Sequence, residues 1–392
     1  MKRVHLVPIG VAVVASVLGG GCRKGDSLGA PDSYVVYAQT LDDQGVVKRS
    51  ASGLPVFDAM ALDAPLAAPL HQQIAVGFLG EMIRTDYLGK EIARDVNIGG
   101  HGFPEAARAA AREPTIFVIG RGMPAAGVGL ATKGTFGGAA DHAGVPWLGL
   151  RDTFGGDRAM PQTIGGALAR RIAARLTGED ETAGSLLVEG YARAMEVIAR
   201  EWRVGEGADG AVAPGAGTGL QRSLFTGVRD SLFAVDEAGA PRPAAALLSD
   251  PGLAATIIYR MAQSKLVGHK VAPAEVYAPF VTEHVPPGVS PAAVLGPFRN
   301  FQAKLLMAWA RAILGGTPPR DIVDLVDDYA RALPDERAEA WRIFVVTTWG
   351  ATVKPGGVDA RKTGVDAALP ELTALAAEVA SGRRSPRAAL GR

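Results

Sequence analysis

Hydrophobic side chains recur at steps of three and four residues through much of the chain, which is the spacing of one face of an α-helix. The most regular stripe occupies 187–202, at Leu187, Tyr191, Met195, Ile198 and Trp202. A second stripe occupies 163–176 and is followed by Gly178, a residue type that commonly ends helices. We therefore expect two packed helices here, and we interpret their bulky side chains as core and not as a cofactor slot.

Signals for the starts and ends of helices predict a mainly helical second half. Asp250 followed by Pro251 supplies a polar cap and a proline suited to a first turn, and Gly268 would end the helix that follows. Comparable patterns of caps, prolines and apolar residues predict the following helices: 253–267, 291–314, 322–333, 337–349 and 366–380. Shorter helical pieces are expected in the first half: 66–84, 86–96 and 104–112.

Strand signals are confined to the first half of the chain. Residues 34–41 and 46–49 are rich in β-forming side chains and flank the turn formers of 42–45, so we expect a β-hairpin. Residues 115–119 form the clearest candidate for a buried strand. The predicted fold class is mainly α: a multi-helix globular body with a small β-hairpin and a few short strands in the N-terminal half. An α+β fold is the alternative.

The least regular stretch is 120–156, which is rich in glycine. Long irregular segments inside compact domains commonly carry function, so we expect a site, if there is one, in this stretch. Arg121 and Arg151 could receive an anionic ligand, whereas isolated loop arginines more often pair with aspartate.

The beginning of the chain has the layout of an export signal. Lys2 and Arg3 precede an apolar run over 4–18, and three glycines then lead to Cys22, the only cysteine. This start resembles the signal of bacterial lipoproteins, although Leu18 lies four positions before the cysteine, and Gly19 stands where those signals usually have an apolar residue. The resemblance implies that Cys22 becomes the mature amino terminus and carries lipid, palmitate included. The alternative is an ordinary signal peptide with an incidental cysteine.

Composition shifts suggest a division of the chain. The expected parts are a signal peptide at 1–21, a tether at 22–31, an α+β domain at 32–203, a Gly/Ala-rich linker or loop at 204–219, a helical domain at 220–382 and a basic tail at 383–392. We expect the tail to be solvated, with contact to anionic lipid as the alternative. The four aspartates of 321–328 are expected on the solvated face of a helix, with a cation site as the alternative.

Composition and charge exclude several classes of protein. Hydrophobic residues at 48% and charged residues at 21% indicate a folded chain, not a disordered one. Because 41 basic residues face 40 acidic ones, no overall field favours nucleic acid as a partner. With Cys22 lipidated, no thiol remains for a disulfide, a nucleophile or a cysteine metal site.

Several known catalytic patterns are missing from the sequence. It contains no His-Glu-x-x-His and no phosphate loop, and Lys362-Thr363-Gly364 has no Ser-x-x-Lys to accompany it. The candidates that remain are His101, between glycines, and Asp141 with His142 in the irregular stretch. Such groups could bind zinc or act as base and orienter. We predict no cofactor, and the sequence leaves open whether a metal is bound.

These observations predict an exported, membrane-anchored lipoprotein of the bacterial envelope, either in the outer membrane or facing the periplasm. Its expected role is non-catalytic, either structural or the binding of another envelope component, and the sequence leans against an enzyme. The expected partners are the membrane, through lipidated Cys22, and that envelope component, with no nucleic acid. Two alternatives stay open: an envelope hydrolase, which could be metal-assisted, and a lipoprotein that binds a small molecule.

Overall fold

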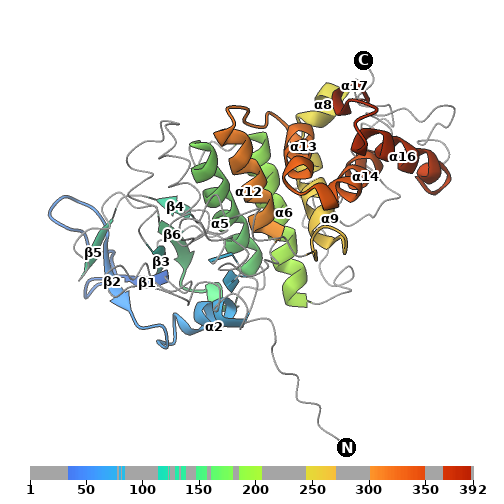
Figure 1. Cartoon of the computed structure of the whole chain (residues 1–392). Helices are drawn as coiled ribbons and strands as arrows, with labels where there is room; N and C mark the ends of the chain where they lie inside the picture. Colours follow the sequence, from blue (N-terminus) through green and yellow to red (C-terminus); the bar gives the residue numbers. More distant parts are fainter. Residues whose placement is uncertain are drawn as a thin grey trace, which may run out of the picture.

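The computed structural model describes residues 34–76, 79–80, 82–83, 114–121, 123, 129–131, 134–137, 147–156, 160–179, 185–204, 244–270, 301–348 and 365–389. The expected signal and tether and residues 205–219 of the expected linker lie outside these residues, and so do the predicted helices of 86–96 and 104–112. In Figure 1 the strands lie at one end of the molecule and α16 and α17 at the other, with α5, α6 and α12 between them.

A six-stranded sheet organises the first part of the chain. Its strands are β1 (Tyr34–Gln39), β2 (Val56–Met60), β3 (Thr115–Gly120), β4 (Gly129–Ala131), β5 (Thr135–Gly137) and β6 (Trp147–Arg151). The strand order is β4-β6-β3-β1-β2-β5. The central strands β6, β3 and β1 are parallel, β2 and β4 run antiparallel to β1 and β6, and β5 is parallel to β2.

The mainly α prediction is therefore wrong, and the architecture is α/β-like. A parallel central sheet is typical of α/β proteins and not of the α+β alternative, in which an antiparallel sheet is segregated from the helices. The reason for the error is that parallel pairing joins segments that are distant in sequence, such as Tyr34 with Thr115 and Ile116 with Trp147. Strands as short as β4 and β5 also carry almost no periodic signal.

The expected β-hairpin is correct in its turn and wrong in its second strand. The Asp42 carboxylate accepts hydrogen bonds from the backbone N–H groups of Gln44 (3.0 Å) and Val46 (2.8 Å), which closes the turn. Beyond it, Val47 makes only an isolated bridge to Leu41. The antiparallel partner of β1 is β2, which starts ten residues after Val46.

The buried strand predicted at 115–119 is confirmed as β3, the strand at the centre of the sheet. All of its residues are buried, because both faces of the sheet are covered. Phe117 and Ile119 belong to the main hydrophobic core, together with residues of the helices. Ile116 and Val118 point to the other face, into a second cluster with Trp147 of β6.

The helices are, in chain order, α2 (Ala68–Val76), α5 (Met160–Thr177), α6 (Leu186–Val204), α8 (Ala244–Leu248), α9 (Pro251–Gln263), α12 (Phe301–Leu314), α13 (Ile322–Ala332), α14 (Arg337–Thr348), α16 (Val365–Ala380) and α17 (Pro386–Ala389). Two 3-10 turns, η1 (Phe154–Gly156) and η5 (Pro334–Glu336), accompany them. No helix among the residues in these ranges is both long enough and apolar enough to cross a membrane.

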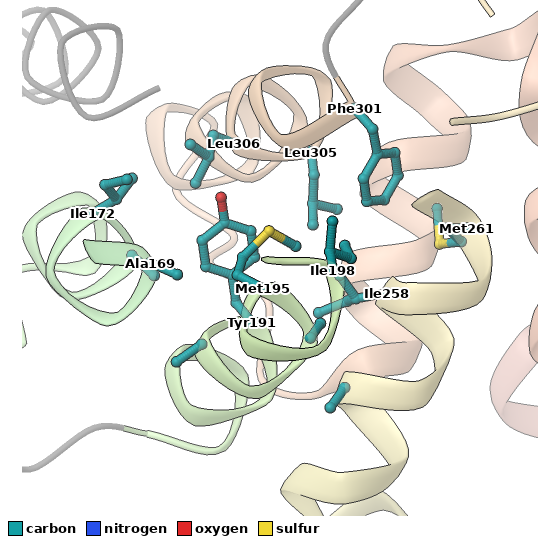
Figure 2. Packing of buried hydrophobic residues seen from close by; sticks show 14 of the residues in the cluster. Ala169, Ile172, Tyr191, Met195, Ile198, Ile258, Met261, Phe301, Leu305 and Leu306 are labelled. Carbon is teal, nitrogen blue, oxygen red and sulfur yellow. The ribbon is translucent and has the colours of Figure 1, made fainter. Parts of the chain in front are cut away.

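The strongest predicted helices are confirmed as α5 and α6. The stripe of α5 is buried, and Gly178 ends the helix with a φ of 73°. On α6 the predicted stripe from Leu187 to Ile198 is buried as well. Figure 2 shows Tyr191 and Met195 of α6 directed toward Leu306 of α12. The stripes therefore pack helix against helix, as their spacing predicts.

One continuous core connects the sheet with the helical body. The main hydrophobic cluster runs from Tyr34 of β1 through α2, α5, α6, α9 and α12 to Val379 of α16. The predicted linker at 204–219 is described only at Val204, the last residue of α6, so the division into two domains stays a prediction.

Candidate functional site

Four residues singled out by the sequence lie outside the described part of the chain: Cys22, His101, Asp141 and His142. Their roles remain predictions. Among the residues that the structure does describe, no three His, Cys, Asp or Glu side chains are grouped so that they could hold a metal ion.

What the structure describes of the irregular stretch 120–156 includes the carboxyl ends of two parallel strands. Gly120 at the end of β3 pairs in register with Arg151 at the end of β6, and Arg121 and Asp152 follow them. β1 ends beside β3, at Gln39 and Thr40. We call these six residues the carboxyl edge: Gln39, Thr40, Gly120, Arg121, Arg151 and Asp152. Open α/β sheets bind their ligands outside the carboxyl ends of the strands.

The carboxyl edge carries more positive than negative charge. Nε of Arg121 lies 3.3 Å from Oδ2 of Asp152, in a pair whose side chains are 75% and 29% exposed. Such an exposed ion pair contributes little to stability, so Arg121 can exchange its partner at low cost. Arg151 is exposed and forms no ion pair with any described residue. Two arginines and one aspartate therefore lie at the ends of two neighbouring strands, and the aspartate pairs with Arg121.

Glycine is required at position 120 by a neighbouring side chain. A Cβ atom there would lie 2.4 Å from Cβ of Gln39 and 2.5 Å from its Oε1, closer than real contacts allow. The Gln39 side chain thus lies over the end of β3. Because side chains alternate along a strand, Gln39 and Arg151 point to the same face of the sheet as Tyr37 and Trp147. Gly120, which has no side chain, separates them.

A hydroxyl and a carboxylate border the carboxyl edge on its β2 side. Oγ1 of Thr40 donates a hydrogen bond to Oδ2 of Asp58, at 2.8 Å. Asp58 pairs in register with Ala38 and is exposed. This carboxylate limits the positive region to the β3 and β6 side of the edge.

The acidic cluster of 321–328 is neither a cation site nor a simple solvated face. Asp321 caps α13 by accepting from the backbone N–H groups of Val323 (3.0 Å) and Asp324 (3.2 Å). Nη2 of Arg387, on α17, lies 3.0 Å from Oδ1 of Asp321 and 2.5 Å from Oδ1 of Asp324. Arg387 of α17 is therefore docked on α13 through these bonds, whereas residues 383–385 of the tail are exposed, as expected.

Sequence reasoning did not single out Gln39, because only the parallel register places it over Gly120. It also missed the pair formed by Tyr34, at the opposite end of β1, and His71 of α2, in which the Tyr34 hydroxyl is hydrogen-bonded to Nδ1 of His71. In contrast, it did anticipate that a loop arginine such as Arg121 would pair with an aspartate.

The fold and the carboxyl edge together define an α/β protein with a candidate anion-binding site. Comparison of the chain with protein-family models, with curated proteins and with solved structures gives no match. The functional argument therefore depends on the residues themselves.

Proposed function

We propose that this chain is an exported, lipid-anchored protein of the bacterial envelope that binds a small anionic ligand at the carboxyl edge of its sheet. Of the three roles that the sequence left open, the geometry favours the small-molecule-binding one. The observation that carries this proposal is the position of Arg121 and Arg151 at the neighbouring carboxyl ends of β3 and β6, where Asp152 is the one carboxylate among the six residues of the edge.

The chemistry of the edge suits a carboxylate or phosphate group. A guanidinium presents its N–H groups in a planar fork that matches both, often through two parallel hydrogen bonds. Arg151 has no competing carboxylate among the described residues, and Arg121, itself exposed, has only the half-buried Asp152. The Gln39 amide, held over Gly120, adds a neutral polar group on the face toward which Arg151 points. The proposed ligand is a small mono- or dianion held by the two arginines.

Replacing Arg151 by alanine is expected to weaken the binding of inorganic phosphate by about tenfold or more, because one charge-assisted hydrogen-bonding group is lost. Asp152→Asn should act in the opposite direction, since it removes the only carboxylate of the edge. Isothermal titration calorimetry on the mature chain measures both effects. Arg311→Ala, at an exposed position on α12, is the matched control and should leave affinity unchanged.

Absence of binding by the unmodified chain, or equal affinities for the Arg151 and Arg311 variants, would contradict an anion site at this edge. The sign of the Asp152→Asn effect is a second check. If Asp152 had a purely structural role, Asp152→Asn would weaken anion binding and not strengthen it.

The anchoring part of the proposal is supported by the arrangement of residues 1–22 and is tested separately. Cys22→Ser leaves the chain without any sulfur to accept lipid at that position, so cells fed labelled palmitate should show complete loss of label from the protein. The protein should also move from the membrane to the soluble fraction. Ser27→Ala, in the expected tether, is the control and should retain the label. Label that persists in the Cys22 variant would refute lipidation at this position.

A further inference from the structure

Four charged side chains form a group between α5 and α6. Arg170 comes from α5, while Glu189, Arg193 and Glu196 come from successive turns of α6. Nη2 of Arg170 lies 2.5 Å from Oε2 of Glu189, and Nε of Arg193 lies 2.6 Å from Oε1 of the same residue. The side chains of these three residues are between 24% and 33% exposed. We call this group the α5–α6 charge cluster.

Glu196 is the member without a hydrogen bond to a described residue. Its side chain lies against Gly166 of α5, where an added Cβ would be 2.3 Å from Cγ and 2.4 Å from Oε1 of Glu196. The absence of a side chain at Gly166 therefore leaves room for the Glu196 carboxyl at the helix interface. Arg170 is one turn farther along α5 from Gly166, which places its guanidinium near both carboxyl groups.

The surroundings of Glu196 and Glu189 shift the pKa values of the two carboxyl groups in opposite directions. Burial raises the pKa of Glu196 to about 7, with a further rise from Glu189 and opposing effects of Arg170 and Arg193. Burial also acts to raise the pKa of Glu189, but the hydrogen bonds from Arg193 and Arg170 outweigh it and hold this pKa below its ordinary value. Near neutral pH one carboxyl is ionised and the other exchanges its proton.

Other charged groups on the helices that pack against α6 have their own surroundings. On α5, Arg171 and Arg175 are buried. On α9, Asp250 accepts from the backbone N–H of Gly252 at 2.8 Å, and Arg260 donates to Oγ1 of Thr347 at 3.1 Å. The groups that act on Glu196 are thus its own cluster partners Arg170, Glu189 and Arg193.

We propose that the α5–α6 charge cluster is a proton-operated switch in which loss of the proton from Glu196 draws Arg170 away from Glu189 and onto Glu196. With the proton in place, both arginines bond Glu189, as in the described geometry. After the proton is lost, Arg193 keeps its one-turn pair with Glu189 on the same helix, and Arg170 pairs with Glu196. Because Arg170 alone belongs to α5, the exchange changes the contact between the two helices. This inference does not depend on the anion site at the carboxyl edge.

The consequence for stability has a definite sign. A carboxyl whose pKa is higher in the folded state contributes stability that is fully present below its unfolded pKa and is lost as the pH rises through the folded pKa. The ordinary pKa of Glu196 is 4.5 and its folded pKa is about 7. The relevant window is therefore between pH 5 and pH 8.

The experiment compares the unmodified mature chain with Glu196→Gln, which is isosteric and permanently neutral. Urea denaturation is measured at several pH values between 5 and 8. Relative to the variant, the unfolding constant of the unmodified chain should rise by roughly tenfold to a hundredfold from pH 5 to pH 8. A ratio that does not change with pH would overturn the proposal, and so would a ratio that falls.

A double-mutant cycle tests the movement of Arg170 itself. Glu196→Gln and Arg170→Gln, alone and together, should show no coupling at pH 5.5 and a clear coupling at pH 8, where Arg170 is expected to hold the ionised Glu196. The control is the same cycle with Arg193→Gln in place of Arg170→Gln. Its coupling energy should change less between pH 5.5 and pH 8. Coupling between Arg170 and Glu196 that is the same at both pH values would mean that Glu196 titrates without recruiting Arg170, and the switch would be refuted.

Discussion

Replacing Lys304 by methionine is expected to lower the free energy of unfolding by about 3–5 kcal/mol, the usual result when one partner of a buried ion pair is removed. The Lys304 side chain is fully buried on α12. Its Nζ donates to the backbone carbonyls of Val267 (2.6 Å) and Lys270 (2.9 Å) and to Oε1 of Glu336 (2.9 Å). Without the ammonium group, two carbonyls would lose this donor, and the buried carboxylate of Glu336 would lose its counter-charge.

The Lys304 group joins four parts of the helical body. It connects α12 with the loop after α9 and with η5, and Tyr329 of α13 donates to Oε2 of Glu336 at 2.5 Å. Burial, together with the charge of Glu336, raises the pKa of the Tyr329 hydroxyl well above its ordinary value, so this hydroxyl stays a donor. The effect of Lys304→Met should therefore appear as destabilisation of the whole body.

Urea denaturation measures this loss, and two controls locate its cause. Lys265→Met, at an exposed position in the loop after α9, should change stability by less than about 0.5 kcal/mol. Adding Glu336→Leu and Tyr329→Phe to Lys304→Met should restore much of the loss, because no unpaired carboxylate then remains buried. A loss below about 1 kcal/mol for Lys304→Met alone would contradict the role of this ion pair.

Replacing Gly268 by alanine is the second change with a large expected effect, a loss of about 3 kcal/mol. A Cβ at this position would lie 1.8 Å from the backbone oxygen of Ala262 and 2.4 Å from its carbonyl carbon. These are backbone atoms near the end of α9, so no side-chain rotation can relieve the overlap. The loop must move instead, and it carries the carbonyls of Val267 and Lys270 that Lys304 binds.

Gly45→Ala serves as the control that distinguishes steric overlap from backbone conformation as the cause of a glycine variant's lost stability. Gly45 has a φ of 76° and no atom within 4 Å of an added Cβ, so only the conformational cost of about 1 kcal/mol applies there. The Gly268 variant should be clearly less stable than the Gly45 variant by urea denaturation. When Gly268→Ala is combined with Lys304→Met, the loss of stability should be smaller than the sum of the two single losses, since both changes disrupt the contact between Lys304 and the loop after α9. Full additivity would argue that the loop and Lys304 act independently.

The end of α9 shows how a correct sequence signal can have a different physical cause. Asp250 and Pro251 start the helix as predicted, with the Asp250 side chain accepting from the backbone N–H of Gly252. The helix ends at Gln263, short of the predicted 267, and the backbone N–H of Ser264 then bonds to carbonyls of its last turn. Gly268 is needed because the loop folds back against Ala262, not because it terminates the helix.

The sequence anticipated one contact of the candidate site and not its geometry. It favoured pairing between a loop arginine and an aspartate, as Arg121 and Asp152 show, and gave anion binding by Arg121 and Arg151 as the alternative. It could not place Gln39 beside them, because the register of parallel strands is invisible in a local pattern. The residues on which the hydrolase alternative depends, His101, Asp141 and His142, lie outside the described residues, so that alternative gains no support from the geometry.

By itself, the sequence determined which segments bury a face and where several helices begin and end. The stripes of α5 and α6, the buried strand β3 and the caps at Asp250 and Gly178 are local properties, set by side-chain spacing and backbone preference. The pairing of the strands, the parallel central sheet and the ion pair between Arg387 and Asp321 came from tertiary contacts. Those choices depend on contacts between residues far apart in the chain, whose free energy no local window contains.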